Sequence, residues 1–291
     1  MQEQATAEIG IIGGSGLYHM TGFEKETTVA LETPFGDPSD VIHVGELEGR
    51  KVAFLARHGK DHRLIPSEIN YRANIYAMKT LGVERVVSAS AVGSMREDLH
   101  PRDVVVPDQF IDRTRVRAST FFGNGIAAHV SFGDPLCPEV RKAVLHAAKS
   151  AGARVRDGGV YVCIEGPAFS TRAESLMYRA WGADVIGMTN LQEAKLAREA
   201  EICYATLALV TDYDCWHQEE QEVSVEALIE NLRVNSGMAQ QAIAHAVRTL
   251  GARGDACGCA HALRDAIITP LDAVSSETRK RLGPILAPYL K

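Results

Sequence analysis

The sequence predicts an α/β fold in which a mainly parallel, mixed central sheet is flanked by helices. Short apolar runs rich in β-branched residues alternate with longer stretches of helical periodicity, which is typical of strands joined by helical crossovers. Of the 291 residues, 46 % are apolar and 23 % are charged, as in ordinary globular proteins. Because no repeat or linker divides the chain, we expect one domain over residues 1–291.

The individual elements follow from local patterns. Strands are predicted at 9–12, 41–44, 52–55, 86–91, 104–106, 160–164, 184–188 and 204–210. Helices are predicted at 66–81, 138–150, 172–181, 191–200, 224–250 and 276–290. Pro66 suits a first helical turn and Gly82 follows the end of that helix, while Ser224 is a suitable N-cap for the longest one. The tail at 251–291 is predicted to begin as a loop and to end as a helix.

Charge and hydropathy exclude several classes of partner. Lys and Arg number 31 against 37 Asp and Glu, so the net charge is −6 and a nucleic-acid partner is not expected. The longest apolar runs, such as 202–210, are too short to cross a bilayer, so no membrane partner is expected. The first eight residues lack the pattern of an export signal, which predicts a cytoplasmic protein.

The cysteines are scattered, which fits a reducing compartment rather than a disulfide scaffold. They occupy positions 137, 163, 203, 215, 257 and 259. Only Cys257 and Cys259 are close-spaced, and even with His261 nearby a metal site lacks a fourth ligand. We therefore expect no metal, and interpret this segment as small residues in a glycine-rich turn, with a local disulfide as the alternative.

Three of the predicted strands end in groups that suit an oxyanion. Gly-Gly-Ser-Gly at 13–16 offers backbone N–H groups and a hydroxyl, and Arg57 and His58 can add side-chain donors. Small hydroxyl residues close a third strand at 88–94. Because ligands of such sheets bind at the carboxyl ends of strands, these groups together predict a phosphate site.

Two further strand ends suit an aromatic ring. Phe169 lies in a loop held by Gly and Pro, and Met188 follows the next strand, although either side chain read singly is as well explained by the core. Asp212 and Asp214 follow the apolar run 204–210, where burying two acids is costly unless they are hydrogen-bonded or used. A structural cap is the alternative for this pair.

Taken together, the motifs resemble the 5′-methylthioadenosine phosphorylase branch of the purine nucleoside phosphorylases, in order over about residues 9–249. The resemblance rests on Ile-Ile-Gly-Gly-Ser-Gly at 11–16, Thr-Pro-Phe-Gly at 33–36, Ala-Arg-His-Gly at 56–59, Glu-Gly-Pro-Ala-Phe-Ser at 165–170, Gly-Met-Thr at 187–189 and Thr-Asp-Tyr-Asp at 211–214. It implies the nucleoside phosphorylase fold and phosphorolysis of 5′-methylthioadenosine to adenine and 5-methylthioribose 1-phosphate. Phosphate is then a co-substrate, and no cofactor is implied. The tail from Gly251 is divergent.

The resemblance also implies residue roles. Phosphate would be held by Ser15, Arg57, His58, Ser90, Thr189 and the backbone of Ala91. The nucleoside would be bound by Phe169 and Ser170 at the base, Met188 at the ribose, and Val225 and Leu228 at the 5′ end. His129 would reach the active site of a neighbouring subunit in a homotrimer or a dimer of trimers.

The same resemblance assigns Asp212 and Asp214 to catalysis. Asp212 would donate a proton to N7 of the base, for which it must be neutral, and burial beside a second acid favours the neutral form. Asp214 would accept from the exocyclic amine, so a 6-aminopurine is favoured. One departure is Gln192, where the family usually has Pro.

Three alternatives stay open at this stage. A broader purine nucleoside phosphorylase would act on adenosine, inosine or methylthioinosine, because one pocket change moves specificity by ~10- to 200-fold. A hydrolytic nucleosidase would use water, which needs no clamp such as Arg57 and His58. A binding protein on the same fold would not turn over. Phosphate-dependent turnover separates the phosphorylases from the other two.

Overall fold

The structure is a computed structural model that describes residues 5–14, 17, 20–217, 225–254 and 257–290, with side chains in the last long helix from residue 230 onward. The strands are β1 (Ile9–Gly13), β2 (Glu24–Val29), β3 (Ile42–Leu47), β4 (Arg50–Ala56), β5 (Arg85–Ser94), β6 (Val104–Val106), β7 (Gln109–Arg113), β8 (Val155–Asp157), β9 (Val160–Ile164), β10 (Val185–Gly187) and β11 (Cys203–Tyr213). The helices are α1 (Tyr71–Thr80), α2 (Pro138–Ser150), α3 (Arg172–Ala180), α4 (Asn190–Glu199), α5 (Val225–Thr249) and α6 (Ser276–Leu286), with short 3₁₀ turns at Lys60–His62, Cys259–His261, Leu271–Ala273 and Ala287–Tyr289.

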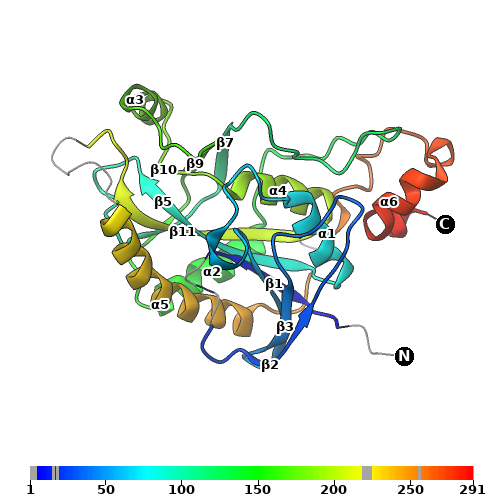
Figure 1. Cartoon of the computed structure of the whole chain (residues 1–291), viewed down its shortest axis with the longest axis horizontal. Coiled ribbons are helices and arrows are strands. Elements are labelled where there is room, and N and C mark those ends of the chain that lie inside the picture. The colour runs from blue at the N-terminus through cyan, green and yellow to red at the C-terminus, as the bar shows by residue number, and fades with distance from the viewer. Residues whose placement is uncertain (1–4, 15–16, 18–19, 218–224, 255–256, 291) are drawn as a thin grey trace.

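The described strands form one mixed sheet of eleven, in the order β2-β3-β4-β1-β5-β10-β9-β7, with β11 pairing to β5 and β6, and β6 to β8. At its centre β4, β1, β5 and β11 run parallel, whereas β10 runs antiparallel to β5. Helices lie on both sides of this sheet (Figure 1). The predicted α/β fold class with a mainly parallel, mixed sheet is therefore confirmed.

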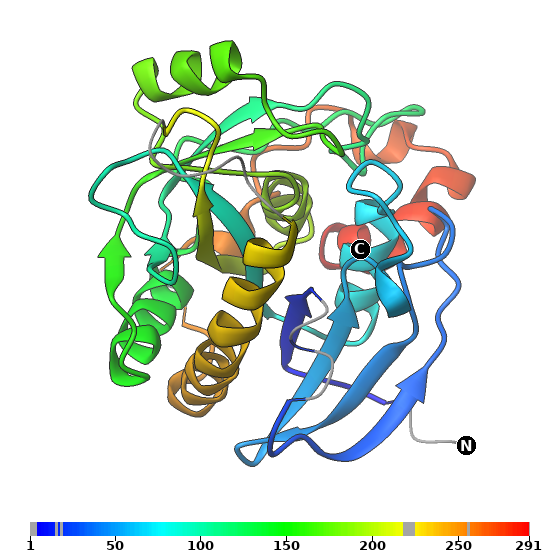
Figure 2. The same ribbon diagram turned by 60° about the vertical axis from the view of Figure 1, so that its left-hand side comes forward.

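Alternation along β11 divides the core into two layers. Cys203, Ala205 and Leu207 pack with the apolar side chains of α2 and α5 on one face. Tyr204 faces the other side, where α1, α4 and α6 bury their apolar residues. Figure 2 shows α2 and α5 lying side by side on their face of the sheet. The period of two thus lets one strand serve both layers.

The differences from the predicted elements have local causes. The helix expected from Pro66 begins only at Tyr71, because the Asn70 side chain accepts from the Ala73 N–H 3.1 Å away and caps the helix there. Residues 65–69 instead form turns, with the Glu68 N–H bonded to the Ile65 carbonyl. The unpredicted β2 is exposed along most of its length, and β8 has three residues, so neither carries an apolar alternation.

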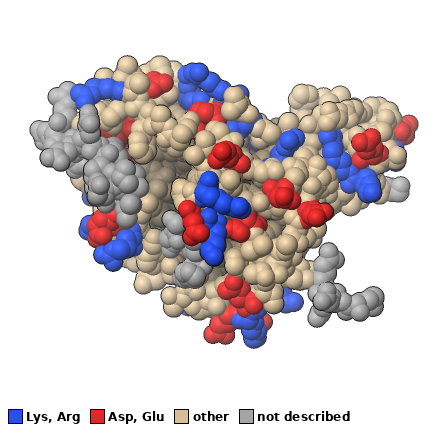
Figure 3. Space-filling model, in the orientation of Figure 1, with Lys and Arg blue, Asp and Glu red and all other residues tan. Residues whose placement is uncertain are grey.

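Two global properties concern the helices and the surface charge. Within the described ranges, no helix combines the length and apolar composition that a bilayer span requires. On the face shown in Figure 3, Lys and Arg are interspersed with Asp and Glu.

Candidate functional site

A cavity of about 370 Å³ opens where β1, β4, β5 and β11 end, and the loops after β9 and β10 complete its wall. Its volume is in the range of small-molecule sites. Most of the residues singled out from the sequence line it together: Arg57, His58, Ser90, Ala91, Phe169, Ser170, Met188, Thr189, Asp212 and Asp214.

Of the remaining candidates, only His129 lies wholly within the described residues. Ser15 lies outside the described residues, as do the side chains of Val225 and Leu228 in the first turn of α5. Further along α5, Leu232 and Ser236 contribute to the wall. His129 is not part of the lining, and its N–H donates to the Ala266 carbonyl 2.8 Å away in the tail.

The floor of the cavity is built on a buried ion pair that the sequence reasoning missed. The Arg57 side chain is 1 % exposed, and its Nε and Nη2 both donate to the Glu193 carboxylate of α4. Its Nη1 donates to the Ala89 carbonyl 2.8 Å away. Burial lowers the pKa of Arg57, but the Glu193 carboxylate raises it above its ordinary value, so the guanidinium is charged.

Further buried side chains extend this pair into what we call the buried polar network, consisting of Arg57, Glu193, Ser88, Ser90, Asn190, Tyr204 and Thr206. Tyr204 Oη donates to Glu193 Oε2 at 2.6 Å, and Ser88 Oγ donates to the same oxygen at 3.0 Å. Asn190 Nδ2 lies 2.8 Å from Tyr204 Oη and 3.1 Å from Thr206 Oγ1, and Asn190 Oδ1 accepts from Ser90. The network therefore fixes the Arg57 side chain and the Ser90 hydroxyl that line the cavity.

His58 stands beside Arg57 in a defined protonation state. Its Nδ1 is 2.9 Å from the Leu64 carbonyl, to which it donates, and its ring stacks on His62 with 4.2 Å between centroids. Burial and the neighbouring Arg57 charge lower the pKa of His58 to about 4. The ring is neutral at pH 7, which leaves Nε2 as an acceptor for a hydroxyl proton.

An irregularity in β11 brings both acids to the cavity. The parallel pairing with β5 shifts between Val210 and Asp212, so that Asp212 lies opposite Gly93. Strict alternation would place Asp212 on the opposite face from Leu209, yet both line the cavity. A bulge at Thr211, whose hydroxyl donates to Asp212 Oδ2 at 2.7 Å, produces this arrangement.

Gly93 provides the space in which the two acids lie. A Cβ at this position would be 3.1 Å from Asp212 Oδ1 and 3.5 Å from Asp214 Cβ. The Asp214 carboxylate is 4 % exposed and accepts from the Ser170 hydroxyl at 2.7 Å. Ser170 therefore links Asp214 to the loop that carries Phe169.

That loop comprises residues 165–170 and follows β9. Gly166 has a φ of 66°, and a Cβ there would be 2.5 Å from Met188 Sδ, so only glycine fits. Arg117, another residue missed in the sequence, holds the loop from below, with its Nε 3.0 Å from Glu165 Oε1. Phe169 stays 55 % exposed at the cavity mouth, where its ring face is free to stack on a planar ligand.

Gln192, the departure noted above, completes this support. It is fully buried in α4, accepts from Arg117 Nη1 at 3.1 Å and donates to Thr114 Oγ1 at 2.8 Å. α4 begins at Asn190, one residue before the predicted start at Leu191. Asn190, Gln192 and Glu193 are buried polar residues in the first turn of α4, whereas Arg117 lies in a loop.

One sequence-based inference about the cysteines requires correction. Cys257 and Cys259 do not lack further ligands, because the sulfur atoms of Cys137 and Cys203 lie beside them, all within 4.8 Å of one another. These partners lie at the start of α2 and of β11, so sequence spacing could not reveal them. None of the four lines the cavity.

Comparison with known proteins supports a shared architecture. The sequence model of the Phosphorylase superfamily matches residues 8–248. The chain is 56 % identical to the S-methyl-5′-thioadenosine phosphorylase of Geobacter sulfurreducens over 97 % of this chain and 99 % of the relative. That alignment includes most of the tail from Gly251, which the superfamily model does not reach.

Solved structures agree with this match. A methylthioadenosine phosphorylase from an antarctic soil metagenomic library superposes with a TM-score of 0.93 at 55 % identity, covering 97 % of this chain and 99 % of the other. A mutant adenosine/methylthioadenosine phosphorylase of Schistosoma mansoni, in complex with methylthioadenosine, gives 0.82 at 35 % identity, covering 89 % and 96 %.

Proposed function

The chain belongs to the Phosphorylase superfamily, and from that premise we propose that it is a pentosyltransferase that cleaves S-methyl-5′-thioadenosine with phosphate. The products are adenine and 5-methylthioribose 1-phosphate, which makes this a salvage reaction. One observation carries the proposal: two carboxyl groups suited to a 6-aminopurine share a cavity with an anion-binding floor. A hydrolase, which uses water in place of phosphate, would not need the anion-binding floor.

We assign phosphate to the floor formed by Arg57, His58, Ser90, Ala91 and Thr189. The Arg57 charge attracts the anion, and the neutral His58 Nε2 accepts the hydroxyl proton of a monohydrogen phosphate. Held below the ribose, a phosphate oxygen stabilises the oxocarbenium-like transition state and then bonds to its C1′. The buried polar network keeps these groups in place before the anion arrives.

We assign the base to Asp212, Asp214 and Phe169. As the bond between C1′ and N9 breaks, Asp212 gives its proton to N7, so the purine leaves neutral. Asp214, oriented by the Ser170 hydroxyl, accepts from the exocyclic amine. The phosphate oxygen replaces N9 on C1′, which balances the bonds formed and broken.

The experiment that tests the proposal measures base release from methylthioadenosine, methylthioinosine, adenosine and inosine, each with and without phosphate. We expect fast release from methylthioadenosine only when phosphate is present. Preference for the inosine forms would overturn the assignment of the two acids. Turnover without phosphate would identify a hydrolase.

A second candidate activity is cleavage of adenosine itself. Ser236 lies on the α5 wall beside Leu232, so this part of the cavity includes a hydroxyl group as well as apolar surface. The Schistosoma relative carries both substrates in its name. The ratio of kcat/KM for methylthioadenosine to that for adenosine decides between them, and Ser236→Ala should raise it.

We further propose that the chain acts as one cytoplasmic domain in a homotrimer or a dimer of trimers, without a catalytic cofactor. The position of His129 outside its own cavity supports a role at a neighbouring site. The mass of the assembly by light scattering, measured for the wild type and His129→Ala, tests this. We expect a trimeric unit in both and a lower kcat/KM in the variant.

A further inference from the structure

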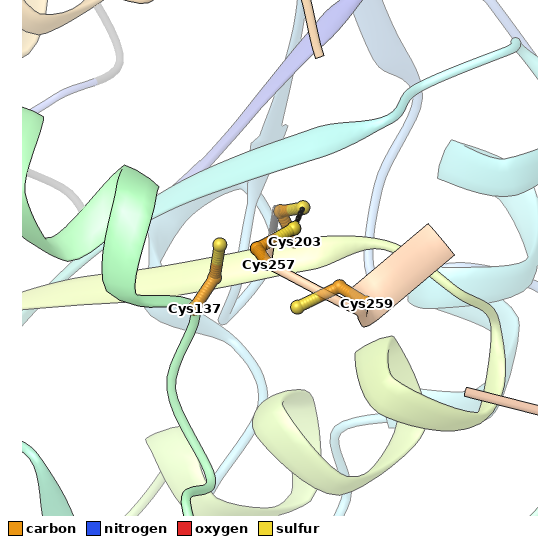
Figure 4. A group of neighbouring side chains, drawn as sticks. All are labelled: Cys137, Cys203, Cys257 and Cys259. Carbon is orange, nitrogen blue, oxygen red and sulfur yellow. Dashed lines mark hydrogen bonds between the residues drawn. The ribbon is translucent and has the colours of Figure 1, made fainter. Parts of the chain in front are cut away.

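Three distant segments bring cysteine side chains to one buried point. Cys137 precedes the first turn of α2, Cys203 begins β11, and Cys257 and Cys259 belong to the tail at its 3₁₀ turn. In Figure 4 their thiols converge on a common space. The Sγ atoms all lie within 4.8 Å of one another, and those of Cys203 and Cys257 are 3.5 Å apart.

These separations suit a tetrahedral thiolate site. A zinc ion bound by four sulfurs at ~2.3 Å places the sulfurs ~3.8 Å apart, which lies between the shortest separation and the upper limit observed here. Soft thiolate ligands in a set of four select zinc over hard cations.

The surroundings match a structural rather than a catalytic site. Cys137 and Cys203 are each 1 % exposed and Cys259 is 3 % exposed, whereas Cys257 is partly exposed. Four cysteine ligands fill a tetrahedral zinc site and leave no position for a substrate. Cys137 stands at the N-terminus of α2, where the helix dipole favours a negatively charged sulfur.

The tail is also directed to this point by bonds that do not involve cysteine. Glu201, two residues before Cys203, accepts from Arg253 through its carbonyl at 2.6 Å and from the Leu263 N–H through its carboxylate at 3.0 Å. These two contacts bracket Cys257 and Cys259 in the chain. The cluster is therefore held together by the fold and not by a chance approach of side chains.

We propose that Cys137, Cys203, Cys257 and Cys259 bind one structural Zn²⁺ that fastens the tail to the base of β11. The ion replaces the thiol protons, and four thiolates complete its coordination, so no oxidant is required. This site is separate from the cavity, and the proposal predicts that the protein contains bound zinc in the absence of substrate.

The first experiment is metal analysis of protein produced in zinc-supplemented medium and purified under reducing conditions without chelator. We expect about one zinc per chain in the wild type. Cys257→Ser should lose most of this zinc, whereas Cys163→Ala, which removes a fully buried cysteine outside the cluster, should retain it.

A second measurement does not depend on how a variant folds. The wild-type protein is stripped of metal and titrated with Co²⁺, for which we expect the visible absorption of tetrahedral cobalt bound to thiolates, and displacement of that signal by Zn²⁺. A folded wild-type protein that gives no cobalt signal and carries no metal would overturn the proposal. So would bound iron, or two disulfides found by mass in these four cysteines.

Discussion

The two halves of the cavity are built differently. At the end that we assign to phosphate, called the anion end, Arg57 is fully buried and its donors are directed by Glu193 into the buried polar network. At the end that we assign to the purine, called the base end, Phe169 is 55 % exposed on its loop, and Asp212 owes its direction to a bulge in β11. The comparison teaches that the anion end is preorganised at a folding cost, whereas the base end is shaped by local backbone irregularities that change more readily.

The largest expected effect breaks the anion end. Glu193→Gln leaves the Arg57 charge buried without its counter-ion, which should lower the free energy of unfolding by about 3–5 kcal/mol. In the fraction that folds, KM for phosphate should rise more than KM for the nucleoside. Urea unfolding and steady-state kinetics measure both.

The matched control for that variant is Lys195→Met on the same helix. Lys195 pairs with Asp112 at 2.6 Å, but both side chains are about one-third exposed, so the loss should be below ~1 kcal/mol. Equal losses in the two variants would contradict the distinction between the buried and the exposed pair.

The next effect concerns specificity at the base end. Asp212→Asn exchanges a proton donor for an amide that bonds a 6-oxopurine better, so the preference for methylthioadenosine over methylthioinosine should fall by ~10- to 200-fold. The ratio of the two kcat/KM values measures it, and KM for phosphate should stay unchanged. An unaltered ratio would mean that the base lies elsewhere.

A backbone substitution tests the same end without removing a carboxylate. Gly93→Ala places a methyl group 3.1 Å from Asp212 Oδ1, so the carboxylate must shift by a few tenths of an ångström, and kcat should fall by less than the ~100-fold that a misplacement of ~1 Å can cost. Gly133→Ala is the control, because nothing lies within 4 Å of the new methyl. If both variants keep wild-type kcat, Asp212 does not depend on Gly93 for its position.

The smallest expected effect is on the pH dependence of the free energy of unfolding, to which two buried groups contribute with opposite signs. The lowered pKa of His58, about 4 against 6.5, means that the unfolded chain binds the proton first, so stability is lost as pH falls through this window. The pKa of Glu199 is raised by burial to about 7 from 4.5, so its contribution is lost as pH rises through that window. Between pH 4.5 and 6.5, the free energy of unfolding therefore rises with pH because of His58 and falls with pH because of Glu199, so the two contributions oppose each other.

Single variants should reveal the two slopes separately. In His58→Gln, stability should decline toward pH 7, and in Glu199→Gln it should decline toward pH 4, each by about 1 kcal/mol per pH unit. Urea unfolding at several pH values measures these trends. If the free energy of unfolding changes with pH in the same direction in both variants, the contributions of His58 and Glu199 do not oppose each other.

Periodicity and strand-end chemistry predicted the frame of the fold. The predicted helix at 138–150 and strand at 160–164 coincide with α2 and β9, because each is apolar on the buried side and bounded by turn residues. Most of the site residues expected from strand ends and from the family resemblance likewise line the cavity.

The rest depends on contacts between distant segments. Glu193 lies 136 residues from Arg57 in the sequence. The sequence of α4 does not distinguish it from an acid on the surface of a helix. The bulge at Thr211 leaves no mark in the sequence, because it arises from the register between two strands. Cys137 and Cys203 meet the tail only through the tertiary fold.

The buried polar network also constrains how this protein evolves. Glu193 accepts hydrogen bonds from Arg57, Ser88 and Tyr204. A mutation that removes this carboxylate therefore leaves three buried donors without their acceptor. To compensate for that loss, several residues that are far apart in the sequence must be replaced together. Each single replacement on its own gives a less stable protein. Phe169 is 55 % exposed, so its replacement carries no such cost to folding. Substitutions at the base end are therefore open to single mutational steps, whereas the buried polar network must be kept or replaced as one unit.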